Sequence, residues 1–167
     1  MRRIRNAHNR RVFPLSREIH ILWAARHKRP AWEGLCSDYR QRIARSVPVR
    51  DLPVKVRRDG PRRKAEEGQA LLAALPDPVW LFALDEGGKS SSSRRFATTL
   101  QRLFDEWPHP IAFVIGSDLG LDPTVRRQAR QVLSFGPMTL RHELARLVLY
   151  EQVYRALEIL RGSGYHH

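Results

Sequence analysis

Three short apolar runs in this chain each lead into a glycine-containing segment, and these segments are the first candidates for binding chemistry. Leu84 precedes DEGGKS, Ile115 precedes GSDLGL, and Phe135 precedes GPMTL. Glycine after a strand permits a sharp turn and lets the backbone approach a ligand closely. Any one of these segments fits an ordinary turn equally well. Ligands of open parallel sheets bind outside the carboxyl ends of the strands, so three such ends together predict a shared pocket.

Two familiar motifs and a metal site do not fit the sequence. Residues 88–90 (GKS) resemble the end of a phosphate-binding loop, but Ala83 stands where that loop requires glycine. Gly116 and Gly120 do not form the G-x-G-x-x-G pattern of dinucleotide-binding folds. The seven histidines lack metal-ligand spacing, and no nearby residues complete a site with His166 and His167. The sequence therefore predicts neither a nucleoside triphosphatase nor a metal enzyme.

Polar side chains near the C-terminus are suited to work on a substrate. Glu151 and Arg155 are four residues apart and share a helix face, which fits a solvent-exposed ion pair as well as an active site. His142 begins the same predicted helix, where it suits target positioning, proton removal or helix capping. Tyr165 and His166 offer a ring that can stack on a base and an imidazole that can hydrogen-bond it. None of these features identifies a general base.

The spacing of apolar residues predicts the elements that must position these groups. Strands are expected at residues 18–24, 52–56, 79–84, 111–115 and 132–135, the second at an edge and the last in the core of the sheet. Helices are expected at residues 31–46, 61–75, 93–107, 123–131 and 142–160. This alternation predicts an α/β fold in which helices flank a mainly parallel sheet.

Length and charge indicate one domain and a polyanionic partner. A chain of 167 residues is long enough for a single domain with a core. Its net charge of +13 favours nucleic acid, because each phosphate neutralised by Lys or Arg releases counterions. Residues 1–17 hold six arginines and no acidic residue, so we expect a flexible basic arm before a folded domain at residues 18–167. A misassigned start codon explains that arm equally well, whereas its few serines and short length argue against a transit peptide.

The sequence predicts neither a membrane-spanning segment nor an internal disulfide. No apolar run approaches the ~20 residues that span a bilayer, so no membrane partner is expected. The single cysteine, Cys36, lies among Trp32, Leu35 and Tyr39 and is expected to be a small buried hydrophobe. A reducing cytoplasm suits an unpaired thiol, so the sequence predicts a cytoplasmic protein.

Three longer segments carry a resemblance to a known family. They are LDEGGKSSSS at residues 84–93, FVIGSDLGLDP at 113–123, and SFGPMTLRHELARLVLYEQVYRALEILRGSGYH at 134–166. Together they resemble the ribosomal RNA large subunit methyltransferase H family of the SPOUT superfamily, over residues 18–167. The resemblance implies a C-terminal trefoil knot, whereas element order alone predicts an unknotted doubly wound sheet. It also implies a homodimer, S-adenosylmethionine as methyl donor, and N3 methylation of a pseudouridine in large-subunit ribosomal RNA.

The resemblance also assigns residues to the site. It implies that eight residues contact the cofactor: Leu84, Gly116, Phe135, Gly136, Pro137, Met138, Thr139 and Leu140. It favours RNA-facing roles for His142, Glu151, Arg155, Tyr165 and His166, with the tail completing the site across the dimer interface. The sulfonium already activates the methyl group, so no metal is required. A bulky side chain, as in Gly116→Val, is expected to block the cofactor while leaving the fold largely intact.

Three positions depart from the usual family pattern. Ser117 and Leu119 stand where the family usually has a second glycine and an acidic residue, and Arg141 replaces a proline. These changes bear on cofactor affinity and on the target rather than on the class of protein. Two alternatives stay open at this point, which are a nonenzymatic RNA-binding or ribosome-assembly protein on the same fold and a methyltransferase for another RNA.

Overall fold

Five parallel strands form the centre of the computed structural model, which describes residues 17–24, 30–56 and 59–166. The strands lie in the order β2-β1-β4-β3-β5. Their bounds are β1 Ile19–Ala24, β2 Val49–Val54, β3 Trp80–Ser90, β4 Ile111–Ile115 and β5 Gln131–Ser134. The helices are α1 Pro30–Ala44, α2 Arg63–Ala73, α3 Ser93–Glu106, α4 Pro123–Gln128 and α5 His142–Arg161, followed by a 3-10 turn at Gly164–His166. The predicted parallel sheet flanked by helices is confirmed.

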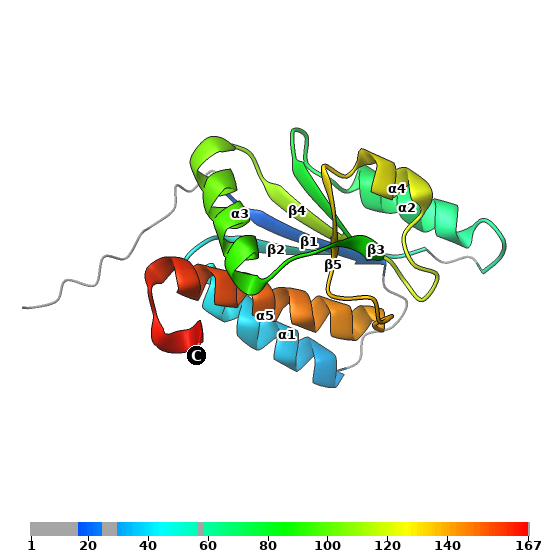
Figure 1. Cartoon of the computed structure of the whole chain (residues 1–167). Helices are drawn as coiled ribbons and strands as arrows, with labels where there is room; N and C mark the ends of the chain where they lie inside the picture. The colour runs from blue at the N-terminus through cyan, green and yellow to red at the C-terminus, as the bar shows by residue number, and fades with distance from the viewer. Residues whose placement is uncertain (1–16, 25–29, 57–58, 167) are drawn as a thin grey trace, which may run out of the picture.

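Helices cover both faces of the sheet (Figure 1), because the strand side chains alternate between two apolar clusters. On β4, Ile111, Phe113 and Ile115 pack on the side of α1, α3 and α5. Ala112 and Val114 face the smaller cluster under α2 and α4. Both clusters leave the carboxyl ends of the strands uncovered by a helix, and this edge is available for a site.

Strand β5 corrects one prediction and β3 another. β5 lies at the edge of the sheet instead of in its core, and its first residues, Gln131 and Val132, are only half-buried. β3 does not end at Leu84 but continues to Ser90 after an irregularity in its pairing with β5. The cause is a close approach of two backbones, since a Cβ atom on Gly88 would lie 2.8 Å from the carbonyl carbon and oxygen of Val132. Glycine is therefore required where β3 passes β5.

Several element ends also differ from those predicted. α4 stops at Gln128 instead of residue 131, because the Arg130 N–H donates to the Leu81 carbonyl oxygen and the chain enters β5. The predicted edge strand at 52–56 is observed as β2, shifted to Val49–Val54.

The predicted basic arm lies, apart from Arg17, outside the described residues. None of the described helices is long and apolar enough to cross a membrane.

Candidate active site

A cavity of about 720 Å³ opens at the carboxyl ends of β4 and β5 and beside residues 84–86 of β3. This volume falls within the roughly 300–1,000 Å³ of small-molecule sites. Seven of the eight predicted cofactor residues line it, namely Leu84, Gly116, Phe135, Gly136, Met138, Thr139 and Leu140. Pro137 is in the same loop but does not line the cavity. The predicted shared pocket therefore exists, while its occupant stays a prediction.

Gly116 begins the loop that follows β4, and this loop folds tightly on itself. A Cβ atom at position 116 would lie 2.4 Å from the carbonyl carbon of Gly120. The N–H of Gly120 donates to the carbonyl oxygen of Ser117 at 3.0 Å, and Gly120 has a φ of +70°. The expectation that a larger side chain at 116 would meet only the cofactor is therefore wrong, because such a side chain collides first with the protein backbone.

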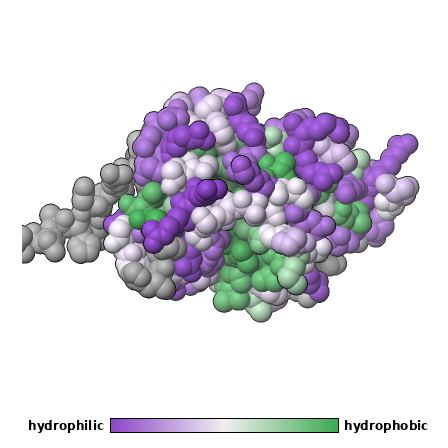
Figure 2. Space-filling view, in the orientation of Figure 1, coloured by the Kyte–Doolittle hydropathy of each residue, from purple (hydrophilic) through white to green (hydrophobic). Residues whose placement is uncertain are grey.

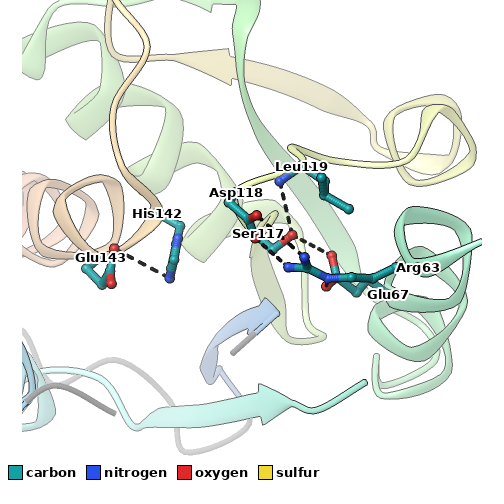
Figure 3. Close-up of polar contacts among 7 residues, drawn as sticks. All are labelled: Arg63, Glu67, Ser117, Asp118, Leu119, His142 and Glu143. Atoms are coloured by element: carbon teal, nitrogen blue, oxygen red, sulfur yellow. Dashed lines mark hydrogen bonds and ion pairs between the residues drawn. The ribbon is translucent and has the colours of Figure 1, made fainter. Parts of the chain in front are cut away.

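A buried polar network ties this loop to α2 (Figure 3). Arg63 donates from Nε to Glu67 Oε1 at 2.8 Å, and its terminal nitrogen bonds the Asp118 carboxylate. Ser117 Oγ donates to Glu67 Oε2 at 2.6 Å and accepts from the Leu119 N–H at 3.2 Å. Arg63 is 7% exposed and Glu67 is 3% exposed. Ser117 is thus a functional part of this chain's loop and not merely a tolerated replacement for glycine.

The charged groups of the network shift each other's pKa values toward the ionised forms. The hydrogen bond from Arg63 holds the pKa of Asp118 below its ordinary value. Asp118 and Glu67 in turn raise the pKa of the Arg63 guanidinium. Arg63 and Glu67 are buried charges, which are tolerated because they are paired and hydrogen-bonded, whereas the Asp118 side chain is 64% exposed. The network therefore fixes residues 116–121, which form one wall of the cavity.

Charged side chains surround the mouth of the cavity. Lys64, Arg126 and Arg141 line it together with Asp85 and Glu86. Arg126 pairs with Asp85 at 3.3 Å. Sequence patterns did not single out Lys64, because no local period distinguishes it from other surface lysines.

The loop after β5 forms the opposite wall. Ser134 Oγ donates to the Gly136 carbonyl oxygen at 2.8 Å and accepts from the Gly136 N–H at 3.0 Å. Within the described part of the chain, residues 137–140 make no backbone–backbone hydrogen bond. Met138 is 80% exposed. An adenine ring needs hydrogen-bonding groups at its edge and apolar contacts on its faces. The backbone groups and apolar side chains of this loop offer both.

His142 also lines the cavity, as the first residue of α5. Its Nε2 lies 3.4 Å from Glu143 Oε2, and its side chain is 22% exposed (Figure 3). Arg141 occupies the N-cap position, and no side chain caps the helix. The capping role considered for His142 is therefore not observed, and its position beside the cavity favours contact with a ligand.

The other predicted catalytic side chains gather near the end of α5. Arg155 donates to Glu151 Oε1 from Nε at 2.8 Å and from its terminal nitrogen at 2.6 Å. The Arg155 guanidinium lies 5.0 Å from the centre of the Tyr165 ring, which packs edge-on against Tyr154. Burial, together with a hydrogen bond to Tyr39, raises the pKa of Tyr165 to about 12. Glu151 and Arg155 are thus part of a half-buried cluster and not a simple solvent-exposed pair.

These two groups are separated along one helix. His142 and Arg155 are thirteen residues apart on α5, which corresponds to about 20 Å. His166 is the last residue of the 3-10 turn after α5, and its side chain lies outside the described residues. A single chain therefore holds the cavity with His142 at one place and Glu151, Arg155 and Tyr165 at another.

The comparisons with known proteins agree on one family. The sequence model described as "Predicted SPOUT methyltransferase" matches residues 18–166. The ribosomal RNA large subunit methyltransferase H of Nitratidesulfovibrio vulgaris (strain DP4) is 40% identical over 157 residues, which cover 90% of this chain and 99% of that relative. This chain belongs to the ribosomal RNA large subunit methyltransferase H family of SPOUT methyltransferases.

A second relative and a solved structure are also similar to this SPOUT methyltransferase. The methyltransferase H of Rhodopseudomonas palustris is 43% identical over 122 residues, or 73% of this chain and 76% of that relative. The crystal structure of a probable methyltransferase from Bordetella pertussis Tohama I superposes with a TM-score of 0.53 at 18% identity. It covers 86% of this chain and 95% of its own, and it supports the fold alone.

Sequence reasoning on this SPOUT methyltransferase missed the Arg63–Glu67 pair. Its i,i+4 spacing was a usable signal, but nothing local indicated that both side chains are buried. Among the described residues, no three His, Cys, Asp or Glu side chains are grouped to hold a metal ion.

Proposed function

We propose that this SPOUT methyltransferase transfers a methyl group from S-adenosylmethionine to large-subunit ribosomal RNA, at N3 of a pseudouridine. The observation that carries this proposal is the cavity beside β3, β4 and β5, which gathers seven of the eight predicted cofactor residues. Family membership and relatives called ribosomal RNA large subunit methyltransferase H support the reaction and the RNA. The net charge of +13 supports a nucleic-acid substrate independently.

The residues of the cavity fit S-adenosylmethionine. Leu84, Ile115 and Leu140 give apolar walls, and the unpaired backbone of residues 137–140 offers donors and acceptors. When bound, the cofactor supplies a methyl group on a cationic sulfur, which keeps the S–C electron pair as the acceptor nitrogen forms its new bond. The protein has mainly to align the reacting atoms. His142 is the residue proposed to position the target or to take the proton from its nitrogen.

The two separated groups of catalytic residues support a homodimeric enzyme. We assign Glu151, Arg155, Tyr165 and His166 to a site that they complete on the partner subunit. Figure 2 shows hydrophobic surface below the centre of the view, where α5 and α1 lie in Figure 1. Leu144 and Leu147 on α5 are half-buried in the single chain, and Leu35 on α1 is 51% exposed. Burying this apolar surface would stabilise a dimer.

Three further features belong to the same proposal. Family membership supports a trefoil knot in the C-terminal part of the domain at residues 18–167. A cytoplasmic location follows from a ribosomal substrate. The six arginines of residues 1–17 support their use as an RNA-binding arm.

Mass mapping of ribosomal RNA tests the proposed function. Cells with and without the gene should differ by one methyl group on a single pseudouridine of the large subunit. Purified protein should restore that group on ribosomal particles from the deletion strain when S-adenosylmethionine is added. Identical nucleotide masses in both strains would contradict a ribosomal target, and methyl transfer to transfer RNA alone would identify the alternative substrate.

A further inference from the structure

A second cavity, of about 660 Å³, lies directly beside the first. The two cavities share three lining residues, Leu133, Phe135 and Gly136. The rest of its wall comes from the serine run at residues 90–93, from Arg94, Phe96 and Ser134, and from Val148 and Gln152 on α5. A ligand in the second cavity would therefore lie beside a ligand in the first, and both ligands would contact Phe135.

Hydrogen bonds connect this second cavity to the Arg155 cluster. Ser93 Oγ donates to Gln152 Oε1 at 2.7 Å, and Gln152 Nε2 donates to Glu151 Oε2 at 2.6 Å. Glu151 in turn accepts both hydrogen bonds from Arg155. One residue of the second cavity, Gln152, is thus hydrogen-bonded to the polar cluster of α5.

The side chain of Gln152 keeps hydrogen-bonding capacity toward the cavity. A side-chain amide has two N–H donors and a carbonyl oxygen with two lone pairs. The bonds to Glu151 and Ser93 use one donor and one lone pair. The remaining N–H can donate to a carbonyl oxygen of a pyrimidine base, while Phe135 and Val148 offer apolar surface to the base plane.

One side of this cavity is basic. Arg94 lines it, and Lys89 and Arg95 lie next to the serine run and to Arg94 in the sequence. The side chains of Lys89, Arg94 and Arg95 are exposed and have no carboxylate partner within the described part of the chain. Serine hydroxyls and arginine together are common ligands of nucleic-acid phosphates. The charge and the hydroxyl groups therefore suit an RNA backbone that passes the mouth of the cavity.

We infer that the second cavity binds the acceptor nucleotide, with one edge of the pyrimidine base at Gln152, its reacting edge toward the first cavity and His142, and its phosphate on Arg94. The base leaves its stack to enter the cavity, as other nucleobases do when an enzyme modifies them. This inference rests on the proposed methyltransferase function. It assigns a substrate role to the serine run and to Gln152, which the cofactor cavity does not use.

Two substitutions test the site without touching the first cavity. Gln152→Leu removes the amide and keeps the size of the side chain, and it should lower kcat/KM for unmethylated ribosomal particles by about 10- to 100-fold. Arg94→Ala should raise KM and reduce the slope of log affinity against log salt by about 1. S-adenosylmethionine affinity, measured by calorimetry, should stay within about twofold of the unmodified protein.

Matched controls separate the site from general charge and fold effects. Arg102→Ala removes an exposed charge from the same helix outside the cavity, and Gln128→Leu makes the same chemical change on α4. Both should keep kcat/KM within about twofold. Equal losses in Arg94→Ala and Arg102→Ala, or full activity of Gln152→Leu, would overturn the inference.

Photo-crosslinking locates the base directly. A ribosomal RNA fragment with 4-thiouridine at the acceptor position should crosslink to peptides that contain residues 90–96 or Gln152. Crosslinks found only elsewhere would overturn the site, even if the protein methylates ribosomes normally. An unmodified protein without methyl transfer to any ribosomal particle would contradict the proposed function instead, so the two failures are distinguishable.

Discussion

Gly116 shows how a single residue can serve the site through the shape of the protein itself. Its hydrogen atom faces the backbone of Gly120, where a Cβ atom would lie 2.4 Å from the carbonyl carbon. The next residue, Ser117, then bonds Glu67, which is fifty residues away in sequence. Both residues hold the loop that lines the cavity, so they affect a bound cofactor mainly through loop geometry.

Gly116→Ala tests this view. The added methyl group should push Gly120 away, lower the free energy of unfolding by about 1–3 kcal/mol, and weaken S-adenosylmethionine binding. Denaturant unfolding and calorimetry measure the two effects. Gly34→Ala is the matched control, because a Cβ atom on Gly34 meets nothing within 4 Å and alanine favours the helix. Unchanged stability of Gly116→Ala would contradict the clash.

Among the elements, α2 acts as the support of the loop after β4. The Arg63–Glu67 pair on α2 is almost fully buried, whereas the Asp38–Arg42 pair on α1 is 54% and 42% exposed. Both pairs have i,i+4 spacing, so sequence alone gives them equal weight. Burial makes the difference, because an unpaired charge costs far more in the interior than in water.

Arg63→Met should therefore be much more damaging than Arg42→Met. We expect a loss of about 3–5 kcal/mol in the free energy of unfolding for Arg63→Met, together with weaker cofactor binding. The loss for Arg42→Met should be much smaller, because a solvent-exposed ion pair contributes little to stability. Urea titration of both variants gives the comparison, and similar losses in the two would mean that the α2 pair has no special role.

The basic arm is an element that should affect RNA and not the cofactor. Removal of residues 2–16 deletes five arginines. The slope of log RNA affinity against log salt should become shallower, because fewer phosphate contacts release fewer counterions. S-adenosylmethionine affinity should not change, since the arm contains none of the cavity residues. Equal salt slopes with and without the arm would show that it does not contact RNA.

For the whole molecule, the distance along α5 decides how many chains form one site. The cavity and His142 lie at one end of the helix, and Arg155 with Tyr165 lies about 20 Å away at the other. In a homodimer, the polar cluster of one subunit can meet the cavity of the other. Each complete site would then combine the start of α5 from one subunit with the end of α5 from the other.

Mixed dimers test this arrangement. A chain without residues 164–167 keeps its cavity, and a His142→Ala chain keeps its tail and Arg155. Each should be inactive alone, and an equal mixture should recover about one quarter of the wild-type rate if subunits pair at random. Ribosome methylation after verified subunit exchange measures the recovery.

The control for this experiment is a mixture of the truncated chain with Arg155→Ala. Arg155 contacts Tyr165 of its own chain, so both variants damage the same polar cluster and no activity should return. Recovery in this control, or none in the His142→Ala mixture, would contradict a site shared in this way.

The sequence by itself determined the elements, the parallel sheet and most of the cavity wall. Apolar periodicity located β4 at Ile111–Ile115 to the residue, and the glycine-containing segments after β4 and β5 identified the binding edge. These features are local, or they follow from the rule that parallel strands end at one edge. The family resemblance, carried by long ordered segments, added the class of protein.

Only the tertiary structure decided which distant side chains meet. It placed β5 at the sheet edge, joined Ser117 to Glu67, and set the serine run beside Gln152. It also showed that His142 and Arg155 lie at different places on the chain, although the sequence had made both candidates for one site. Such contacts have no sequence period, because they depend on strand order and on how helices pack across the sheet rather than on local chain geometry.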